Sequence, residues 1–292
     1  MLVNLTDICA IAEQNNMAIA QFDTPSLEAL RAALDAAEEL GYPVMVAHAE
    51  GHEPFVPLDV IGPTMVELAE RSSAMVCVHL DHCENLSYMR RALEMGFNGA
   101  MFDGSYLPYE KNVEMSQYAS QMCAEFNAGL ECELGSMGSR EAGVRPEGGT
   151  AEESGAIYTD PEQAFDFISS TGLDALACSF GTVHGLYKGE PHLNYDVLTK
   201  IRKKNKVPLV MHGGSGVSDE DYIKSINAGI RKINYYTYGV VRAGEAVRGI
   251  VDSSVGKPVY WHDMTMAAYD AFYADFKKTI EVFANGALTT NV

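Results

Sequence analysis

Short apolar runs alternate with longer stretches of helical spacing along the whole chain. The apolar runs are rich in strand-forming residues, and eight of them can be distinguished. They are Ala18–Asp23, Val44–Ala49, Cys77–Asp81, Ala100–Asp103, Gly129–Leu134, Ala175–Phe180, Leu209–Gly213 and Lys232–Thr237. The stretches between them predict helices such as Ser26–Leu40, Asn85–Met95, Glu110–Asn127, Pro161–Ser170, Asp219–Ala228 and Gly239–Val251.

Strict alternation of strands and helices places parallel strands in one sheet. Eight such units fit a closed (β/α)8 TIM barrel better than an open doubly wound sheet, which stays open as an alternative. We expect additional C-terminal helix from Ser254–Val292. Prolines and glycines are scattered rather than gathered in a linker, so one domain spanning residues 1–292 is the expectation.

The amino-acid composition indicates which classes of binding partner the chain disfavours. Lys+Arg number 21 and Asp+Glu 40, and 21 − 40 gives a net charge of −19, which repels phosphate backbones and anionic membrane surfaces. No apolar run is long enough to span a bilayer, and the first residues carry an acid where a signal peptide carries basic residues. We therefore expect a soluble, cytoplasmic protein that binds neither nucleic acid nor membrane. The six cysteines form no CxxC pair and are expected to be reduced packing residues.

Residues that can ionise or bind metals follow most of the predicted strands. TIM barrels carry their chemistry at the C-terminal ends of the strands, so these residues are expected to converge on one rim. They are His79, Asp81 and His82 at the end of the third strand, Asp103 at the end of the fourth, Glu131 and Glu133 in the fifth, His184 after the sixth, His212 at the end of the seventh and Asn234 in the eighth.

Three of these residues predict a metal site. A lone histidine is usually a satisfied core or surface residue, but His82, His184 and His212 stand at equivalent strand ends. Three imidazoles with an open fourth position are the arrangement expected of catalytic Zn²⁺. His79 lies two residues before Asp81 and shares its face of the strand, so we expect it to orient another group.

The neighbouring carboxylates suggest proton transfer and further cation binding. Asp81 next to His82 is suited to moving a proton at an oxygen that the metal activates, although a hydrogen-bonding role is the alternative. Asp103 and Glu133 can hold a second divalent cation or an alternative position of the first, or can be structural hydrogen-bond acceptors.

Glycine-rich connections after the last strands predict a phosphate site, because the corresponding loops of TIM barrels bind phosphate recurrently. We expect contacts from Gly185, Lys188, Gly213, Gly214, Ser215, Asn234, Tyr235, Tyr236 and Thr237, with an exposed, solvated role for Lys188 as the alternative. Leu134–Gly149 is long, polar and glycine-rich, which makes it a candidate lid. Glu141 within it can bring a carboxylate over the site.

Several motifs together resemble the class II, zinc-dependent ketose-bisphosphate aldolases over nearly the whole barrel. They are HLDH (79–82), MFDGS (101–105), LECELG (130–135), YTDPEQA (158–164), GTVHGLYKGEP (181–191), MHGGSG (211–216) and KINYYT (232–237). The resemblance implies reversible aldol cleavage of a ketose phosphate to dihydroxyacetone phosphate and an aldehyde. It also implies a homodimer or homotetramer, whereas it leaves a monovalent-ion requirement open.

The resemblance assigns roles to individual positions. It implies Zn²⁺ on His82, His184 and His212, with Asp103 and Glu133 at a second metal position. Asp81 would exchange the proton of the hydroxyl at the reacting bond, and Glu141 would take the carbon-bound proton. Dihydroxyacetone phosphate would contact Gly185, Gly213, Ser215, Asn234 and Thr237. We expect Asp81, Glu141 and Asn234 to be the catalytic residues.

The chain departs from the family pattern in three places. Tyr235 and Tyr236 follow Asn234 where the family usually has a small residue, and Ala49-Glu50 replaces Ser or Thr followed by Pro. Residues 254–268 contain no arginine, the residue that fructose-bisphosphate members use for the distal phosphate. We therefore hypothesise a substrate other than fructose 1,6-bisphosphate, whose aldehyde half lacks a phosphate or carries other polar groups and faces His48, Glu50 or His52.

Other functions remain possible from the sequence. A Schiff-base aldolase needs a buried lysine, usually on the sixth strand; that strand has none, and Lys232 opens the eighth strand far from its rim. A metal-dependent sugar-phosphate epimerase or hydrolase can use the same three histidines. A non-catalytic sugar-phosphate-binding protein is the third alternative.

Overall fold

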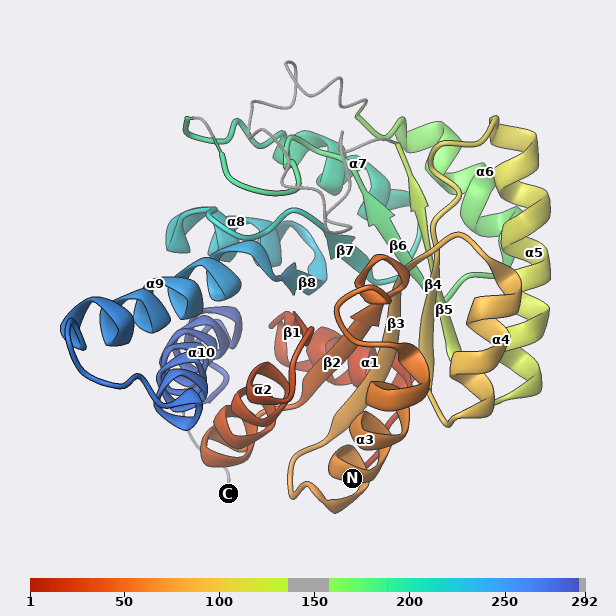
Figure 1. Cartoon of the computed structure of the whole chain (residues 1–292). Coiled ribbons are helices and arrows are strands. Elements are labelled where there is room, and N and C mark those ends of the chain that lie inside the picture. Colours follow the sequence, from red (N-terminus) through yellow and green to blue (C-terminus); the bar gives the residue numbers. More distant parts are fainter. Residues whose placement is uncertain (136–157, 188, 289–292) are drawn as a thin grey trace.

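Eight parallel strands close into one barrel in sequence order, from β1 to β8 and back to β1 (Figure 1). The computed structural model describes residues 1–135, 158–187 and 189–288. The strands are β1 (Ile19–Asp23), β2 (Val44–Ala49), β3 (Val76–Cys83), β4 (Gly99–Phe102), β5 (Gly129–Leu134), β6 (Ala175–Cys178), β7 (Leu209–Met211) and β8 (Ile230–Tyr235). The predicted (β/α)8 barrel is confirmed, and the open sheet is excluded.

Helices surround the barrel and connect its strands. They are α1 (Leu5–Asn15), α2 (Leu27–Leu40), α3 (Leu58–Arg71), α4 (Leu86–Glu94), α5 (Tyr109–Glu125), α6 (Pro161–Thr171), α7 (Tyr195–Lys204), α8 (Asp219–Ala228), α9 (Thr237–Ser253) and α10 (Trp261–Phe283), with a short 3-10 turn, η1 (Glu50–His52), after β2. The extra C-terminal helix that the sequence predicts is α10. Helix α1 precedes the first strand and buries Leu5, Ile8, Cys9 and Ala12 against the barrel.

The predicted ends of several strands are displaced by a few residues. β3 continues two residues beyond Asp81, whereas β6 ends at Cys178 and β7 at Met211, earlier than expected. The apolar pattern extends past the last ladder hydrogen bonds of β6 and β7, because the chain stays buried as it turns into the mouth of the barrel. Residues such as Phe180 and His212 are fully buried without belonging to a strand.

Helix α10 is part of the core rather than a peripheral addition. It packs against α2 and α9 and reaches β1, and its buried face includes Phe272, Phe276 and Ile280. The ring of Phe276 stacks on Phe22 of β1 with centroids 4.0 Å apart. Burying several large apolar side chains in this way stabilises the barrel near β1 and β8.

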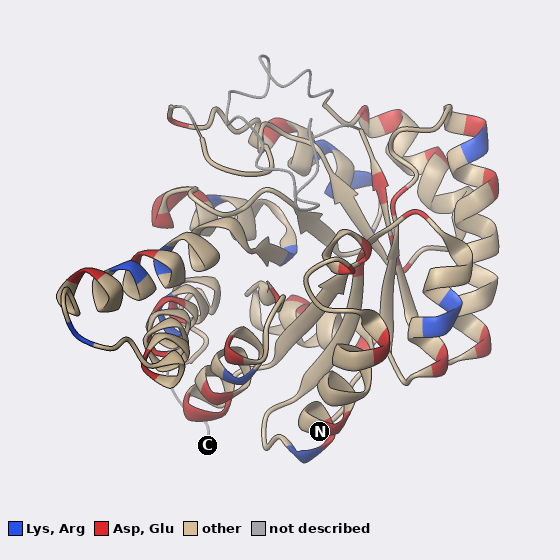
Figure 2. Cartoon of the chain, in the orientation of Figure 1, with Lys and Arg blue, Asp and Glu red and all other residues tan. Residues whose placement is uncertain are grey.

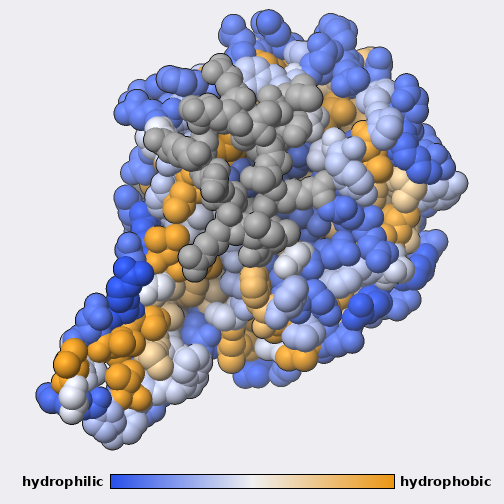
Figure 3. All heavy atoms as spheres, turned by 45° about the horizontal axis from the view of Figure 1, so that its top comes forward, coloured by the Kyte–Doolittle hydropathy of each residue, from blue (hydrophilic) through white to orange (hydrophobic). Residues whose placement is uncertain are grey.

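Acidic residues lie on most of the helices, with fewer basic residues between them (Figure 2). Apolar side chains gather on the protruding hairpin of α9 and α10 (Figure 3); exposed members include Val251, Val255, Tyr260 and Trp261. All six cysteines are free and buried, as expected. Among the described residues, no helix has the length and apolar character needed to cross a bilayer.

Candidate active site

A bulge at the end of β3 brings two neighbouring side chains to the mouth of the barrel. Consecutive residues of a regular strand point to opposite faces, so Asp81 and His82 would normally diverge. The pairing of β3 with β4 shifts register between Leu80 and Cys83, and His82 has a left-handed φ of 42°. Both Asp81 and His82 are therefore buried at the same site, with Oδ2 and Nε2 3.8 Å apart.

The three histidines from separate strand ends meet at this site. The ring centroids of His82 and His212 are 4.6 Å apart, those of His82 and His184 4.9 Å, and those of His184 and His212 5.9 Å. One nitrogen from each ring lies within 4.8 Å of the other two. All three side chains are buried at the C-terminal end of the barrel.

Carboxylates fix the orientation of two of these rings. Asp103 Oδ2 accepts a hydrogen bond from His82 Nδ1 at 3.0 Å, and Glu131 Oε1 accepts one from His212 Nε2 at 2.7 Å. An ionised carboxylate only accepts, so these bonds place the protons on the outer nitrogens. The remaining nitrogens, His82 Nε2 and His212 Nδ1, face each other at 3.0 Å. Two lone pairs at that distance need a proton or a cation between them.

The protonation of the histidines follows from their surroundings. Burial alone lowers the pKa of His82, but the charge of Asp81 and the hydrogen bond that His82 donates to Asp103 outweigh burial and raise the pKa to about 10. Burial and the neighbouring His82 hold the pKa of His184 well below its usual range. Burial also lowers the pKa of His212. In the metal-free protein, one proton is therefore held at His82 while the other two rings are neutral.

The donor set fits a divalent metal of the zinc type. Both ring nitrogens of His184 are buried and have no hydrogen-bond partner among the residues that the structure describes, which is costly in a protein interior unless a ligand is present. Three neutral imidazoles with carboxylates behind two of them are the usual donor arrangement of catalytic zinc sites. His82, His184 and His212 can therefore hold such an ion.

Asp81 is held in its ionised form beside the histidines. Burial raises its pKa, but the charges of His82, His212 and Lys232 more than compensate and keep the pKa well below its usual range. Asn234 Nδ2 donates to both carboxylate oxygens, at 3.1 and 3.2 Å. Lys232 Nζ in turn donates to Asn234 Oδ1 at 2.7 Å, which fixes which way the amide points.

A buried ion pair deeper in the barrel supports the site, and the sequence reasoning missed it. Lys232 Nζ lies 2.8 Å from Glu131 Oε2, and both side chains are fully buried. His79, which we expected to orient another group, lies beside this pair, with Nε2 3.7 Å from Glu131 Oε2. Burial and the charge of Lys232 lower the pKa of His79 to about 3. The orienting contact to His212 comes from Glu131 rather than from His79.

The two-residue alternation of side chains along the strands could have revealed the ion pair of Lys232 and Glu131 from the sequence. Side chains two residues apart on a strand share a face. Each of the pairs His79 and Asp81, Glu131 and Glu133, and Lys232 and Asn234 therefore has one member at the rim and one a layer below. The lower members neutralise one another. The sequence reasoning set Lys232 aside as a Schiff-base nucleophile but did not consider it as an ion-pair partner, because only the rim was considered.

Glu133 and Asp103 form a second cluster with His82. Their ligand atoms also lie within 4.8 Å of one another. Burial, and then the charge of Asp103, raise the pKa of Glu133 well above its usual range. Of the two acidic groups in the cluster, only Asp103 is therefore held ionised. A further cation bound there would neutralise the negative charge of the two carboxylates.

The connections after β6, β7 and β8 lie against one another on the opposite side of the mouth. Gly213 has a φ of 61°, and a Cβ there would lie 2.5 Å from Val183 O, so only glycine fits. Ser215 Oγ accepts a hydrogen bond from Tyr236 N at 2.9 Å, which joins the last two connections. Helix α9 then begins at Thr237 with no acidic residue in its first turn. Backbone amides at a helix start of this kind favour an anion.

Not every expected residue faces the mouth. Tyr235, expected in the phosphate site, points outward: its hydroxyl donates to Asp275 Oδ2 at 2.9 Å and its ring packs near Phe22 and Phe276. The period of β8 turns it away from Asn234, so we withdraw it from the site. The side chain of Lys188, and Glu141 with the predicted lid, lie outside the described residues.

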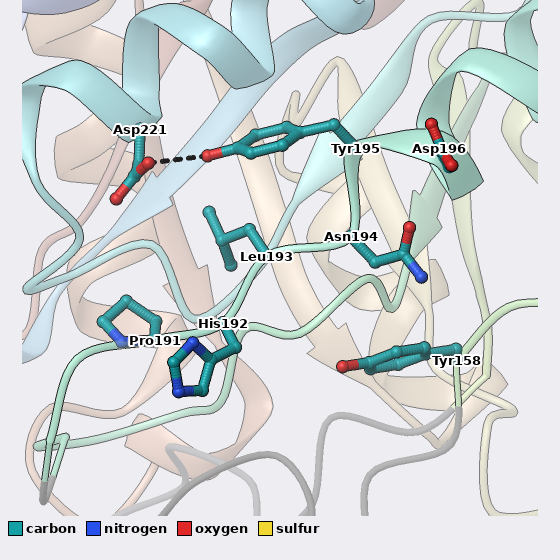
Figure 4. Close-up of a pocket in the computed structure, with 8 residues that line it drawn as sticks. All are labelled: Tyr158, Pro191, His192, Leu193, Asn194, Tyr195, Asp196 and Asp221. Atoms are coloured by element: carbon teal, nitrogen blue, oxygen red, sulfur yellow. Dashed lines mark hydrogen bonds between the residues drawn. The ribbon is translucent and has the colours of Figure 1, made fainter.

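A separate surface hollow of about 590 Å³ lies between the β6–α7 connection and α8 (Figure 4). Tyr195 crosses it and donates a hydrogen bond to Asp221 Oδ1 at 2.7 Å. Its lining includes none of the clustered imidazoles or carboxylates. The barrel mouth is therefore the candidate active site.

Comparisons with known proteins agree with this geometry. The model of the family "Fructose-bisphosphate aldolase class-II" matches residues 3–286. A probable fructose-bisphosphate aldolase of Bacillus subtilis is 34% identical over 250 residues, which cover 85% of each chain. The solved YdjI aldolase of Escherichia coli K12 is 28% identical, with a TM-score of 0.83 over 98% of this chain and 99% of that one. A putative fructose-1,6-bisphosphate aldolase from Coccidioides immitis shares the fold, with a TM-score of 0.85 at 24% identity over 98% of each chain.

Proposed function

Because the chain belongs to the class II fructose-bisphosphate aldolase family, and so to the aldehyde-lyases, we propose that it reversibly cleaves a ketose phosphate into dihydroxyacetone phosphate and an aldehyde. The observation that carries this proposal is the convergence of His82, His184 and His212 beside Asp81, facing a glycine-rich anion cradle.

We propose that the three histidines hold Zn²⁺. When bound, such an ion supplies Lewis-acid polarisation of the substrate carbonyl and hydroxyl oxygens. The chain prepares for this with the hydrogen bonds from His82 to Asp103 and from His212 to Glu131, which aim one nitrogen of each ring at the common centre. Asp103 and Glu133 are proposed as the second cation position.

Asp81 is the proposed proton carrier at the hydroxyl of the reacting bond. In cleavage it removes the hydroxyl proton as the carbon–carbon bond breaks, and in condensation it returns that proton to the aldehyde oxygen. Asn234 and the charges around it keep the carboxylate ionised and correctly rotated. Glu141 is proposed to exchange the proton at the donor carbon, as the family resemblance implies.

The phosphate of the donor half is proposed to lie between the connections after β7 and β8. Gly213, Gly214 and Ser215 provide backbone amides there, and the start of α9 at Thr237 adds a helix N-terminus. Gly185 and Lys188 are proposed to complete the contacts, and Tyr236 lies beside them through its bond to Ser215.

The Schiff-base alternative is disfavoured by the state of the only lysine in the barrel strands. Lys232 is fully buried and bound to Glu131 and Asn234 as a charged donor. A Schiff-base lysine must instead be neutral and accessible to a carbonyl. No other strand of the described barrel contains a lysine.

The test of the proposed function is retro-aldol turnover with a panel of ketose phosphates. Asp81→Ala should abolish turnover yet leave the zinc content measured by elemental analysis unchanged, because the three imidazoles remain. Glu141→Ala should slow exchange of deuterium from solvent into dihydroxyacetone phosphate. Glu94→Gln, an exposed acid on α4, is the control that should change neither. Turnover that survives a chelator would contradict the zinc mechanism, and so would a covalent enzyme–substrate adduct trapped by borohydride.

A further inference from the structure

Three residues at the end of β2 and in the connection after it, His48, Glu50 and His52, were candidates for contact with the aldehyde half, and the structure separates them. Glu50 Oε2 accepts hydrogen bonds from the amides of Glu84 and Asn85 at 2.8 and 3.2 Å, so it ties the connections after β2 and β3 together. His48 points away from the barrel interior, and its Nε2 bonds to the hydroxyl of Tyr88 at 2.9 Å. His52 is therefore the stronger candidate for contact with the substrate, although Nδ1 of His48 also has no hydrogen-bond partner among the described residues.

His52 lies across the barrel mouth rather than outside it. Its ring packs against that of Tyr236, which follows β8, with centroids 4.9 Å apart, although His52 itself follows β2. Tyr236 stands two residues after Asn234, whose Nδ2 donates to Asp81, so this ring contact places His52 on the same part of the mouth as the proposed proton carrier. His52 therefore lies at the mouth between the connection after β2 and the connection after β8.

The imidazole of His52 has unused hydrogen-bonding capacity. It is 1% exposed, and its Nδ1 has no partner among the described residues. Burial, reinforced by nearby His48, lowers the pKa of His52 to about 4, so the ring is neutral at pH 7. A buried, unsatisfied ring nitrogen in a polar mouth indicates a hydrogen-bonding ligand, such as a hydroxyl group.

The charges on this side of the mouth disfavour an anionic aldehyde. The connections after β1, β2, β3 and β8 contain no lysine or arginine, whereas they contain Glu50, Glu53 and Glu84. Arg91 of α4 is the cation that acts on Glu53, and it is paired with Asp59 over the outer face of Tyr88. A second phosphate bound against these four connections would meet acidic side chains, and the described residues of these connections supply no compensating cation.

We propose that His52 binds a hydroxyl group of the aldehyde half and selects an uncharged, hydroxylated aldehyde over a phosphorylated one. This inference rests on the proposed aldolase function and specifies its substrate class. The neutral imidazole and the aromatic ring of Tyr236 form the recognising surface. The acidic residues Glu50 and Glu84, in the connections after β2 and β3, disfavour anionic competitors.

The test compares aldehydes that share a three-carbon skeleton and differ in their substituents. Condensation with saturating dihydroxyacetone phosphate is measured for glyceraldehyde, glyceraldehyde 3-phosphate and propanal. The native enzyme should have its highest kcat/KM with glyceraldehyde. His52→Phe keeps a ring against Tyr236 but removes the hydrogen bond, so it should lower kcat/KM for glyceraldehyde by about tenfold and that for propanal by less than about twofold.

Two further variants distinguish specificity from damage. His52→Gln keeps a hydrogen-bonding group and should retain most of the preference for glyceraldehyde. Phe55→Leu alters an exposed ring 5.8 Å from His52 and should leave all three values unchanged. A native preference for glyceraldehyde 3-phosphate, or an equal loss for all three aldehydes in His52→Phe, would overturn the proposal.

Deuterium exchange into dihydroxyacetone phosphate in the absence of aldehyde separates this proposal from the proposed function. Exchange involves only the donor half, so His52→Phe should exchange at the native rate. If the native protein shows no exchange, the aldolase function itself fails. If exchange is native while the aldehyde preference is absent, only the role of His52 fails.

Discussion

Lys232→Met tests whether the buried ion pair beneath the site is needed for the fold. Methionine nearly matches lysine in length, so the change removes a charge without leaving a large cavity. Lys232 Nζ contacts Glu131 Oε2 at 2.8 Å and Asn234 Oδ1 at 2.7 Å, and both members of the ion pair are fully buried. Removing one partner of a buried pair leaves an uncompensated charge and costs about 3–5 kcal/mol of unfolding free energy.

The dependence of this loss on pH follows from Glu131. In the native protein, burial raises its pKa but Lys232 and His212 outweigh burial and lower the pKa to about 2. A depressed carboxyl pKa stabilises the fold above the unfolded value of about 4.5, and this stabilisation is lost as the pH falls toward 2. Without Lys232 the pKa of Glu131 rises, so the carboxyl takes up a proton at higher pH. The loss of unfolding free energy in Lys232→Met, relative to the native protein, should therefore become smaller as the pH falls from 8 to 5.5.

Equilibrium urea unfolding of the metal-free protein at these two pH values measures the effect. Lys232→Met combined with Glu131→Gln should recover part of the loss, because no unpaired charge remains. Lys224→Met, in an exposed pair with Glu220, is the matched control and should change stability little. The reasoning is refuted if the deficit of Lys232→Met is the same at both pH values, or if the double variant is no more stable than the single one.

Two further predictions concern the metal and the assembly. At pH 7 zinc binding should displace the proton held by His82, whose metal-free pKa is about 10. Calorimetric titration in buffers of different ionisation enthalpy should therefore show release of about one proton per site. An apparent heat of binding that is independent of the buffer would contradict this. Trp261 on the α9–α10 hairpin is 75% exposed in the single chain. If this hairpin forms the contact of the expected homo-oligomer, Trp261→Ser should lower the mass measured by sedimentation. An unchanged oligomeric mass would assign the contact to another surface.

The sequence by itself determined the barrel and the residue types of its rim. Eight β-rich runs alternating with helical stretches allow few arrangements besides a closed parallel barrel, and hydrophobic periodicity reports that pattern directly. Because all strand ends of such a barrel meet at one face, His82, His184 and His212 could be assigned to one site although they lie far apart in the chain. Motif resemblance then identified the family.

Only the tertiary structure decided how individual side chains point. The bulge at His82 puts it beside Asp81, and the turn of β8 sends Tyr235 out to Asp275. Whether Lys232 is a nucleophile or a buried ion-pair partner depends on Glu131, which lies 101 residues earlier in the chain. A strand's periodicity fixes which residues share a face, but register shifts and contacts between distant strands decide which of those faces meet, and these depend on the closed barrel as a whole.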